Sequence, residues 1–423
     1  MKKRHSSESG QALVLIVLAM VVLFGIAVLV LGSSNVFTNR RHAQMGSDAS
    51  SLAGGGAAAL YMENHHVIYG NFTCSNANVI AAQNSTDSDN PGAKMAAIAR
   101  AADNDYTIDD DIADTHGVIT ECGIENHGGW ADKYIDIKTM ITADTETSFA
   151  QFVFNGIMRN TVEAITRVRP RSPAVFGHAI VALNPAACQD QQNGAGFHGN
   201  ADVNVTGGGI FSNGCLSADG GPSVSVTDGT VNYVSEMDEP GKFSPTAQPS
   251  EALSPSSYVI PPPNCAHADA WNGTGTQLEA LSPLEPGLYC VTGDLKINGG
   301  TFTGTDVTIY MADGDLTING NATVILDAPE AEPDPTPAIS GVLIYAPQSN
   351  DEDILLNGSG DSSFVGTVYV PGADVTLLGN SETIAFHTQI IGWNVEVGGT
   401  AGADVVFNAP EQFSRPALLE LYK

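Results

Sequence analysis

The sequence is poor in basic residues. It holds 17 Lys and Arg against 47 Asp and Glu, so its formal net charge is -30 with His neutral. Binding of a phosphate backbone needs clustered Lys and Arg, so the composition excludes nucleic acid as a partner. Charged residues nevertheless make up only 15% of the chain and hydrophobic residues 43%, a balance that supports a packed core and excludes a disordered chain.

Aromatic residues are also scarce, at 7% of the chain, whereas Gly occurs 45 times. Few aromatics and many glycines favour a turn-rich, mainly β body. No two cysteines are spaced as C-x-x-C, which argues against a zinc or thioredoxin-like site, and we predict no cofactor. The length of 423 residues is enough for two or three domains.

Residues suited to catalysis are few. Between Arg171 and Arg415 the only Lys or Arg residues are Lys242 and Lys296. Few residues could therefore serve as the Arg or Lys base of a lyase. The His residues of this segment lie beside no Ser or Cys motif. We therefore predict no catalytic residue and no enzymatic activity, and a carbohydrate-active β-helix enzyme is the least favoured alternative.

An unbroken apolar run covers residues 12–31. Twenty helical residues rise about 30 Å, the thickness of a bilayer core. The run predicts a transmembrane helix over 12–32 after a basic cytoplasmic tail over 1–11, and the alternative is a cleaved signal peptide. Three basic residues precede the run and two, Arg40 and Arg41, follow it, which predicts a cytoplasmic N-terminus and an extracytoplasmic C-terminal part.

Residues 33–172 are expected to form a helical and small α/β region. Small residues over 49–59 would allow close helix packing, and three glycines at 54–56 should bend a helix, because each costs roughly 1 kcal/mol relative to Ala. Helical periodicity and alternation predict, in chain order, a helix over 92–100, strands over 118–121 and 134–138, a helix over 147–156 and a strand over 161–168.

An acidic cluster lies between two of these elements. Its carboxylates could supply the oxygen ligands that calcium prefers. Their spacing misses the EF-hand pattern, which favours a solvated acidic loop instead. The candidate metal-ligating residues are Asp103, Asp105, Asp109 and Asp111.

The C-terminal part contains a repeat. The segment 293–299 (GDLKING) recurs as 314–320 (GDLTING), 21 residues later. A step of about 20 residues with short alternating strands predicts a β-solenoid, a parallel right-handed β-helix, over 173–414, followed by a tail over 415–423. A β-sandwich is the alternative, but it gives no reason for a constant step. Further copies of the segment begin at Asp202, Asp353, Asp374 and Asn394.

An aspartate stands at the start of the strand in five copies of the repeat, and four of these aspartates are candidates for a shared column. The four are Asp294, Asp315, Asp353 and Asp374. They would form an outward column, and two carboxylates facing one groove are what a glycoside hydrolase uses. A position that recurs in every copy is more typical of a turn, where Asp hydrogen-bonds local backbone.

The six cysteines are an even number, which suits disulfides in an oxidising exterior. Fifteen pairings are possible. The simplest joins neighbours in the sequence, as Cys74–Cys122, Cys188–Cys215 and Cys265–Cys290.

Seven residues near the N-terminus carry a family resemblance. They are Gly10, Gln11, Arg41, Gln44, Asp48, Leu52 and Gly54. With the apolar run between them, they resemble the N-terminal region of TadG-like proteins of the Tad (Flp) pilus-assembly system. Residues 317–324 (TINGNATV) are similar to solenoid-like regions attached to such N-termini. The fifth residue after Gly10 is Leu15, where substrates of prepilin peptidases carry Glu, and this argues against cleavage.

The resemblance implies a membrane-anchored, surface-exposed structural component of pilus assembly, either minor pilin-like or a tip or adhesion subunit, that displays a rigid β-solenoid. Its partners would be the membrane and, through the N-terminal helix, other pilin-like or pilus-assembly subunits. The alternative is an envelope module that binds a surface glycan or matrix polymer and has no role in pili.

Overall fold

The chain forms two compact units. The computed structural model describes residues 9–112, 116–145, 158–188, 194–200, 202–330, 337–357, 359–379, 384–399 and 402–422. Unit 1 comprises Met1–Ile124, Lys133–Pro170 and Ala417–Lys423, and unit 2 comprises Glu125–Asp132 and Arg171–Pro416. The long segment of unit 2 is therefore an insertion in the sequence of unit 1.

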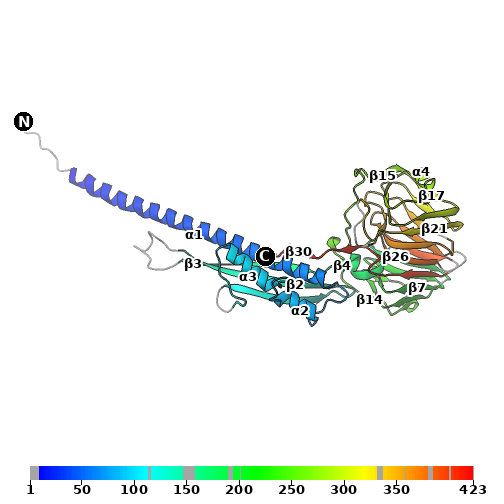
Figure 1. Ribbon diagram of the computed structural model, residues 1–423, viewed down its shortest axis with the longest axis horizontal. Helices are drawn as coiled ribbons and strands as arrows, with labels where there is room; N and C mark the ends of the chain where they lie inside the picture. The colour runs from blue at the N-terminus through cyan, green and yellow to red at the C-terminus, as the bar shows by residue number, and fades with distance from the viewer. Residues whose placement is uncertain are drawn as a thin grey trace, which may run out of the picture. The chain divides into compact units, whose positions relative to one another are not determined.

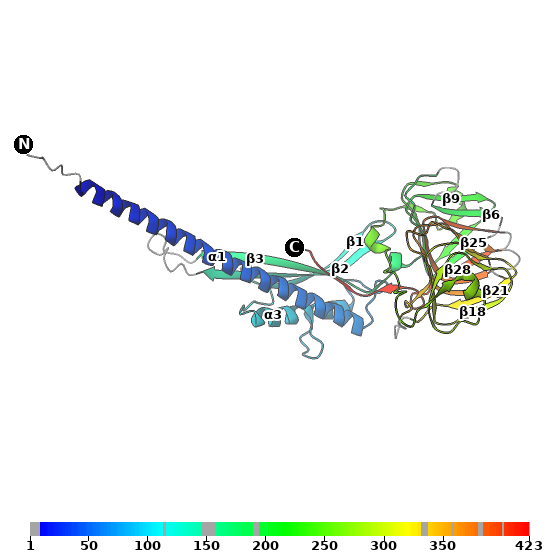
Figure 2. The ribbon, with the colours of Figure 1, turned by 90° about the horizontal axis from the view of Figure 1, so that it is seen from above.

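Unit 1 is built around one long helix and an antiparallel sheet. Helix α1 (Ser9–Asn64) has 56 residues. Its C-terminal half lies along the sheet and its N-terminal half runs on beyond the sheet (Figures 1 and 2). The helix continues through the three glycines at 54–56, where the sequence predicted a bend.

The sheet of unit 1 has four strands in the order β1-β2-β3-β30. Its strands are β1 (Gly117–Asn126), β2 (Ala131–Thr145), β3 (Met158–Arg169) and β30 (Leu418–Leu421). Two short helices, α2 (Ala77–Asn84) and α3 (Ala93–Asp103), complete the unit. The expected strands at 118–121, 134–138 and 161–168 lie within β1, β2 and β3, and the helix expected over 147–156 lies outside the described residues.

Alternation along β2 fixes which face of the sheet is covered. Ile135, Ile137, Thr139 and Ile141 are buried, whereas Asp136, Lys138 and Met140 are partly exposed. Because successive side chains of a strand point to opposite faces, one face of the sheet packs into the core of unit 1 and the other meets solvent.

The expectation of a transmembrane helix over 12–32 is wrong. A bilayer span needs about 20 consecutive apolar residues. Within the described part of the chain no helix, α1 included, is long and apolar enough to cross a membrane. The single-pass topology with a cytoplasmic N-terminus rested on this segment and is withdrawn with it.

Unit 2 confirms a mainly β class with parallel sheets. One sheet has eight strands, and every pairing within it is parallel. In spatial order its strands are β12 (Glu236–Met237), β9 (Cys215–Gly220), β6 (Ala195–Gly199), β27 (Val395–Gly399), β25 (Val375–Gly379), β23 (Ile354–Leu356), β20 (Leu316–Ile318) and β17 (Leu295–Ile297).

A second sheet of unit 2 has 16 strands, again paired in parallel. Its main path runs through β13 (Phe243–Ser244), β10 (Val224–Thr227), β7 (Val203–Thr206), β28 (Ala403–Val406), β26 (Ile384–Gly392), β24 (Ser363–Val370), β22 (Val342–Tyr345), β19 (Val307–Met311), β16 (Gly287–Thr292) and β15 (Trp271–Thr274). Off this path lie β5 (His178–Ala182), β8 (Gly209–Ser212), β11 (Val231–Tyr233), β14 (Gln248–Pro249), β18 (Gly300–Gly304) and β21 (Ala322–Asp327). A short helix, α4 (Gly275–Glu279), follows β15.

Five of the six copies of the repeat lie side by side in the eight-stranded sheet, whereas the copy that begins at Asp202 forms β7 of the 16-stranded sheet. Leu295 pairs with Leu316, and Leu316 pairs in turn with Ile354. Ile354 pairs with Val375, which pairs with Val395. The equivalent residues of successive copies therefore form one row, and all five are buried.

The order of strands in space differs from their order in the chain. The first strands of unit 2 pair with its last ones: β5 with β26, β6 with β27 and β7 with β28. The chain thus enters the stack in its middle, builds outward to β13, continues at the opposite end with β15, and returns to its starting point. Entry and exit are joined by antiparallel pairing of β4 (Ser172–Pro173) with β29 (Ser414–Arg415).

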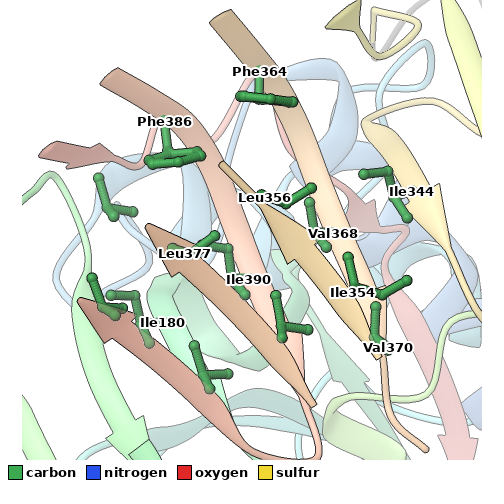
Figure 3. Close-up of a cluster of buried hydrophobic side chains, with 14 of the residues drawn as sticks. Ile180, Ile344, Ile354, Leu356, Phe364, Val368, Val370, Leu377, Phe386 and Ile390 are labelled. Carbon is green, nitrogen blue, oxygen red and sulfur yellow. The ribbon is translucent and has the colours of Figure 1, made fainter. Parts of the chain in front are cut away.

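Rows of aliphatic and aromatic side chains fill the interior of unit 2. Figure 3 shows Leu356 and Leu377 from one sheet facing Val368 and Ile390 from the other. All four are fully buried.

The six cysteines form three disulfides, between the neighbours in the sequence. Cys74 is bonded to Cys122 within unit 1. Cys188–Cys215 and Cys265–Cys290 lie in unit 2. Disulfides persist in oxidising environments, of which the extracellular space is one.

Two adjacent leucines of β23 test which side chains of the stacked strands point into the core of unit 2. Leu356 is fully buried and its neighbour Leu355 is partly exposed. We expect Leu356→Ala to lower the free energy of unfolding of unit 2 by about 2–5 kcal/mol, because it leaves a cavity between stacked rows. Leu355→Ala should cost less than about 1 kcal/mol. Urea titration of the full chain measures both, and equal losses would contradict the inward and outward assignment.

Candidate functional site: the helix face of unit 1 and the aspartate column of unit 2

Polar side chains fix one face of α1 on the sheet of unit 1. Gln44 donates a hydrogen bond from Nε2 to Asp48 Oδ1 at 2.7 Å and another to the carbonyl oxygen of Glu163 at 3.2 Å. One turn on, Ser47 and Thr139 exchange hydrogen bonds: Ser47 Oγ donates to the Thr139 carbonyl oxygen, and Thr139 Oγ1 to that of Ser47. Residues three and four apart share a helix face, so these bonds set the rotation of α1.

Two glycines permit the close approach of α1. A Cβ at Gly54 would lie 2.8 Å from the carbonyl oxygen of Ala93, and one at Gly55 would lie 2.6 Å from Thr166 Cγ2. Both distances are shorter than a van der Waals contact. At Gly56 nothing lies within 4 Å. Tertiary packing therefore accounts for the first two glycines and not for the third.

The residues of the N-terminal motif separate into two groups. Gln44, Asp48 and Gly54 belong to the packed face just described. Arg41 and Leu52 are exposed. Gly10 and Gln11 lie in the first turns of α1, and their side chains are outside the described residues.

The first part of α1 exposes apolar side chains over residues 13–26, here termed the exposed segment. Their exposed fractions lie between 54% and 70%. Apolar surface of this extent marks an interaction site in most proteins. The large apolar residues are Leu13, Val14, Leu15, Ile16, Val17, Leu18, Met20, Val21, Val22, Leu23, Phe24 and Ile26.

The repeated aspartates of unit 2 form a column joined by hydrogen bonds. Asp294 Oδ1 accepts from the backbone N–H of Asp315 at 3.3 Å, and Asp315 Oδ1 accepts from that of Asp353 at 3.2 Å. Asp374 Oδ1 accepts from Asn394 Nδ2 at 2.8 Å. Each carboxylate thus bonds the next strand of the stack, as expected for a structural turn.

Charge and burial act unequally along the aspartate column. A hydrogen bond from Lys296 lowers the pKa of Asp294 below its usual value. Burial, together with the charge of Asp374, raises the pKa of Asp353. Repulsion from Asp315 raises the pKa of Glu352, beside the column. These shifts follow from the charges of neighbouring residues and from burial within the stack.

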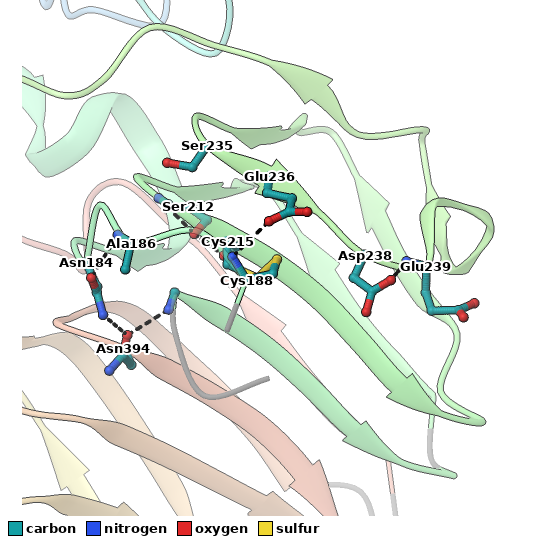
Figure 4. The surroundings of a disulfide bond; sticks show 12 residues. Asn184, Ala186, Cys188, Ser212, Cys215, Ser235, Glu236, Asp238, Glu239 and Asn394 are labelled. Carbon is teal, nitrogen blue, oxygen red and sulfur yellow. Dashed lines mark hydrogen bonds between the residues drawn. A yellow bond between two sulfur atoms is a disulfide. The ribbon is translucent and has the colours of Figure 1, made fainter. Parts of the chain in front are cut away.

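An asparagine replaces the aspartate where the last copy of the repeat meets the first coil. Asn394 Oδ1 accepts from Asn184 Nδ2 at 2.9 Å and from the backbone N–H of Gly194 at 2.7 Å, close to the disulfide Cys188–Cys215 (Figure 4). An Asp at this position could not donate to Asp374 as Asn394 does. The sequence does not reveal this contact, because Asn184 lies 210 residues earlier.

His178 is a second residue whose role the sequence does not show. It begins β5, is buried, and its Nε2 lies 2.8 Å from the carbonyl oxygen of Gly129. Burial lowers the pKa of His178 from 6.5 to about 4. It is neutral at physiological pH and therefore donates from Nε2 to Gly129. From the sequence, His178 is only one of several histidines that lie beside no Ser or Cys motif.

The candidate metal ligands of unit 1 that the structure describes have other partners. Asp103 Oδ2 lies 3.7 Å from Arg100 Nη1, and Asp109 Oδ2 lies 3.4 Å from His116 Nε2. Asp111 Oδ1 accepts from the backbone N–H of Ile112. Across the described ranges no group of three or more His, Cys, Asp or Glu residues is placed to hold a metal ion.

Comparison with protein-family models, with curated proteins and with solved structures finds no match for this chain. The structure offers an exposed apolar helix segment in unit 1 and a stacked acidic β body in unit 2.

Gly55 and Gly56 provide a matched test of the helix contact. We expect Gly55→Ala to lower the free energy of unfolding of unit 1 by about 1–3 kcal/mol, because its Cβ overpacks against Thr166. Gly56→Ala should raise it by up to about 1 kcal/mol, since Ala favours a helix and meets no atom. Chemical denaturation followed by circular dichroism measures both, and stabilisation by Gly55→Ala would contradict the contact.

His178 predicts a pH dependence of unit 2. Its pKa is lower in the folded than in the unfolded chain, so the unfolded chain binds the proton first as the pH falls below 6.5. Because of this difference in pKa, the free energy of unfolding of unit 2 should fall by about 3 kcal/mol as the pH is lowered from 6.5 to 4. The His178→Gln variant should lose this dependence of stability on pH. The control His198→Gln, at a half-buried position, should retain it. Urea midpoints over this pH range measure the slope.

Proposed function

We propose that this protein is a structural subunit of a Tad (Flp) type pilus-assembly system, minor pilin-like or at a filament tip, and has no enzymatic activity. The observation that carries the proposal is the division of α1. Its C-terminal half is fixed on an antiparallel sheet, whereas its exposed segment presents apolar side chains over more than three turns. In a filament, this segment would pack against the same segment of other subunits.

We further infer that unit 2 is a parallel right-handed β-helix. Parallel strands, a 21-residue step and inward rows of equivalent residues support this inference. Crossovers between parallel strands of one sheet are almost always right-handed, which supports the hand. A stack of this kind resists bending, and it would serve as a rigid displayed surface for adhesion or assembly.

Charge supports a second candidate, a surface-binding module without a role in pili. Unit 2 carries 30 Asp and Glu against only four basic residues, a formal charge of -26 with His neutral. Its acidic surface would attract a cationic matrix polymer or one bridged by cations. This candidate gives the exposed segment of α1 no function, so we place it second.

The two candidates differ in where the protein is found. We would shear surface filaments from intact cells of the native host, measure the protein in the filament fraction and in the stripped cells, and read its N-terminus by mass spectrometry. The proposal expects recovery with filaments. If the N-terminal residue of the recovered protein is Gln11, the chain is also cleaved after Gly10. Recovery only with stripped cells would overturn the filament role.

Two leucines of α1 test the contact itself. Leu18 is 57% exposed and lies in the exposed segment, and Leu60 is 61% exposed beyond it. Leu18→Glu should reduce the filament-bound fraction at least tenfold, because it places a charge in an apolar interface. Leu60→Glu should leave that fraction unchanged. Neither residue is in the core, so circular dichroism should show both variants folded. Equal effects would contradict a contact through the exposed segment.

A further inference from the structure

Six asparagines occupy the acceptor position of the sequence Asn-x-Ser/Thr. This tripeptide accepts N-linked glycans in exported proteins. The three disulfides indicate that the folded chain resides in an oxidising compartment, where such glycans occur. The six residues are Asn71, Asn84, Asn204, Asn272, Asn321 and Asn357.

Accessibility and hydrogen bonding distinguish one of these asparagines. All except Asn357 are exposed. The amide nitrogens of the other exposed ones are engaged as donors, from Asn71 to the carbonyl oxygen of His66, from Asn84 to that of Ile80, from Asn204 to Asp404 and from Asn272 to the carbonyl oxygens of Cys265 and Ala270. Asn321 has no hydrogen-bond partner for its side chain in the part of the chain that the structure describes.

The backbone presents Asn321 as an acceptor. It ends the turn between β20 and β21, directly before the buried Ala322. Asn321 is exposed, and Thr323 lies between the buried Ala322 and Val324 on the outer side of β21, so both point away from the core. Thr323 is partly exposed, and its hydroxyl lies 3.0 Å from that of Ser359. A bulky group on Asn321 would extend into solvent without displacing a core side chain.

We propose that Asn321 carries an N-linked glycan. The donor is an oligosaccharide attached through its anomeric carbon to a lipid-linked phosphate. Nδ2 of Asn321 forms a bond to the anomeric carbon, and the bond from that carbon to the phosphate oxygen breaks. The lipid phosphate leaves with the electron pair, and the amide gives up one proton. This modification is independent of any role in pili.

The sequence around Asn321 allows a direct test. Digestion with a protease that cuts before Asp releases the peptide 315–326, in which Asn319 and Asn321 are the only asparagines. In protein purified from its native host, this peptide should carry the mass of a glycan, and fragmentation should place it on Asn321. Protein from a host without the transferase should give the unmodified mass.

Matched variants complete the test. Asn321→Gln and Thr323→Ala should each abolish the glycan, whereas Thr323→Ser, which keeps the hydroxyl, should retain it. Asn319→Gln is the control, because Asn319 is followed two residues later by Asn321 and has no Ser or Thr there. Finding only the unmodified peptide in native protein, or a glycan on Asn319, would overturn the proposal.

Discussion

Parallel pairing between the first and the last strands of unit 2 is the interaction on which its architecture depends. The β5–β26, β6–β27 and β7–β28 pairs close the stack in its middle. Because of these pairs, residues 171 and 416 can lie at one place, and a body of more than 200 residues can be inserted in the sequence of unit 1. Asn394 completes the junction, since its amide, unlike the carboxylate of the other copies, can both accept from Asn184 and donate to Asp374.

The acidity of unit 2 is compatible with this stacking because its repeated carboxylates have backbone partners. Asp294 and Asp315 each accept an N–H from the following strand. These bonds offset the repulsion between like charges placed one strand apart. Where burial adds to the repulsion, as at Asp353, the pKa rises. The aspartate column therefore has a structural role. A binding partner would contact the other acidic residues on the surface of unit 2.

Unit 1 depends on a different constraint, the close approach of α1 to its sheet. Gly54 and Gly55 remove the side chains that would separate the two surfaces, and Ser47 and Gln44 satisfy polar groups along the same face. The cost of glycine in a helix is offset by packing, which explains why α1 stays helical where local propensity predicted a bend. The same helix leaves its apolar start uncovered, and our functional proposal follows from that contrast.

The sequence by itself determined the features that arise from local or periodic patterns. The 21-residue repeat predicted a stack of short parallel strands, and alternation predicted the positions of β1, β2 and β3. Cysteine order suggested the three disulfides. The apolar run at 12–31 led to a transmembrane helix that the structure does not support. Tertiary structure alone decided the order of strands in the stack, the burial of His178 and the contact of Asn394 with Asn184. These features join segments up to about 200 residues apart, and no local pattern records such pairings.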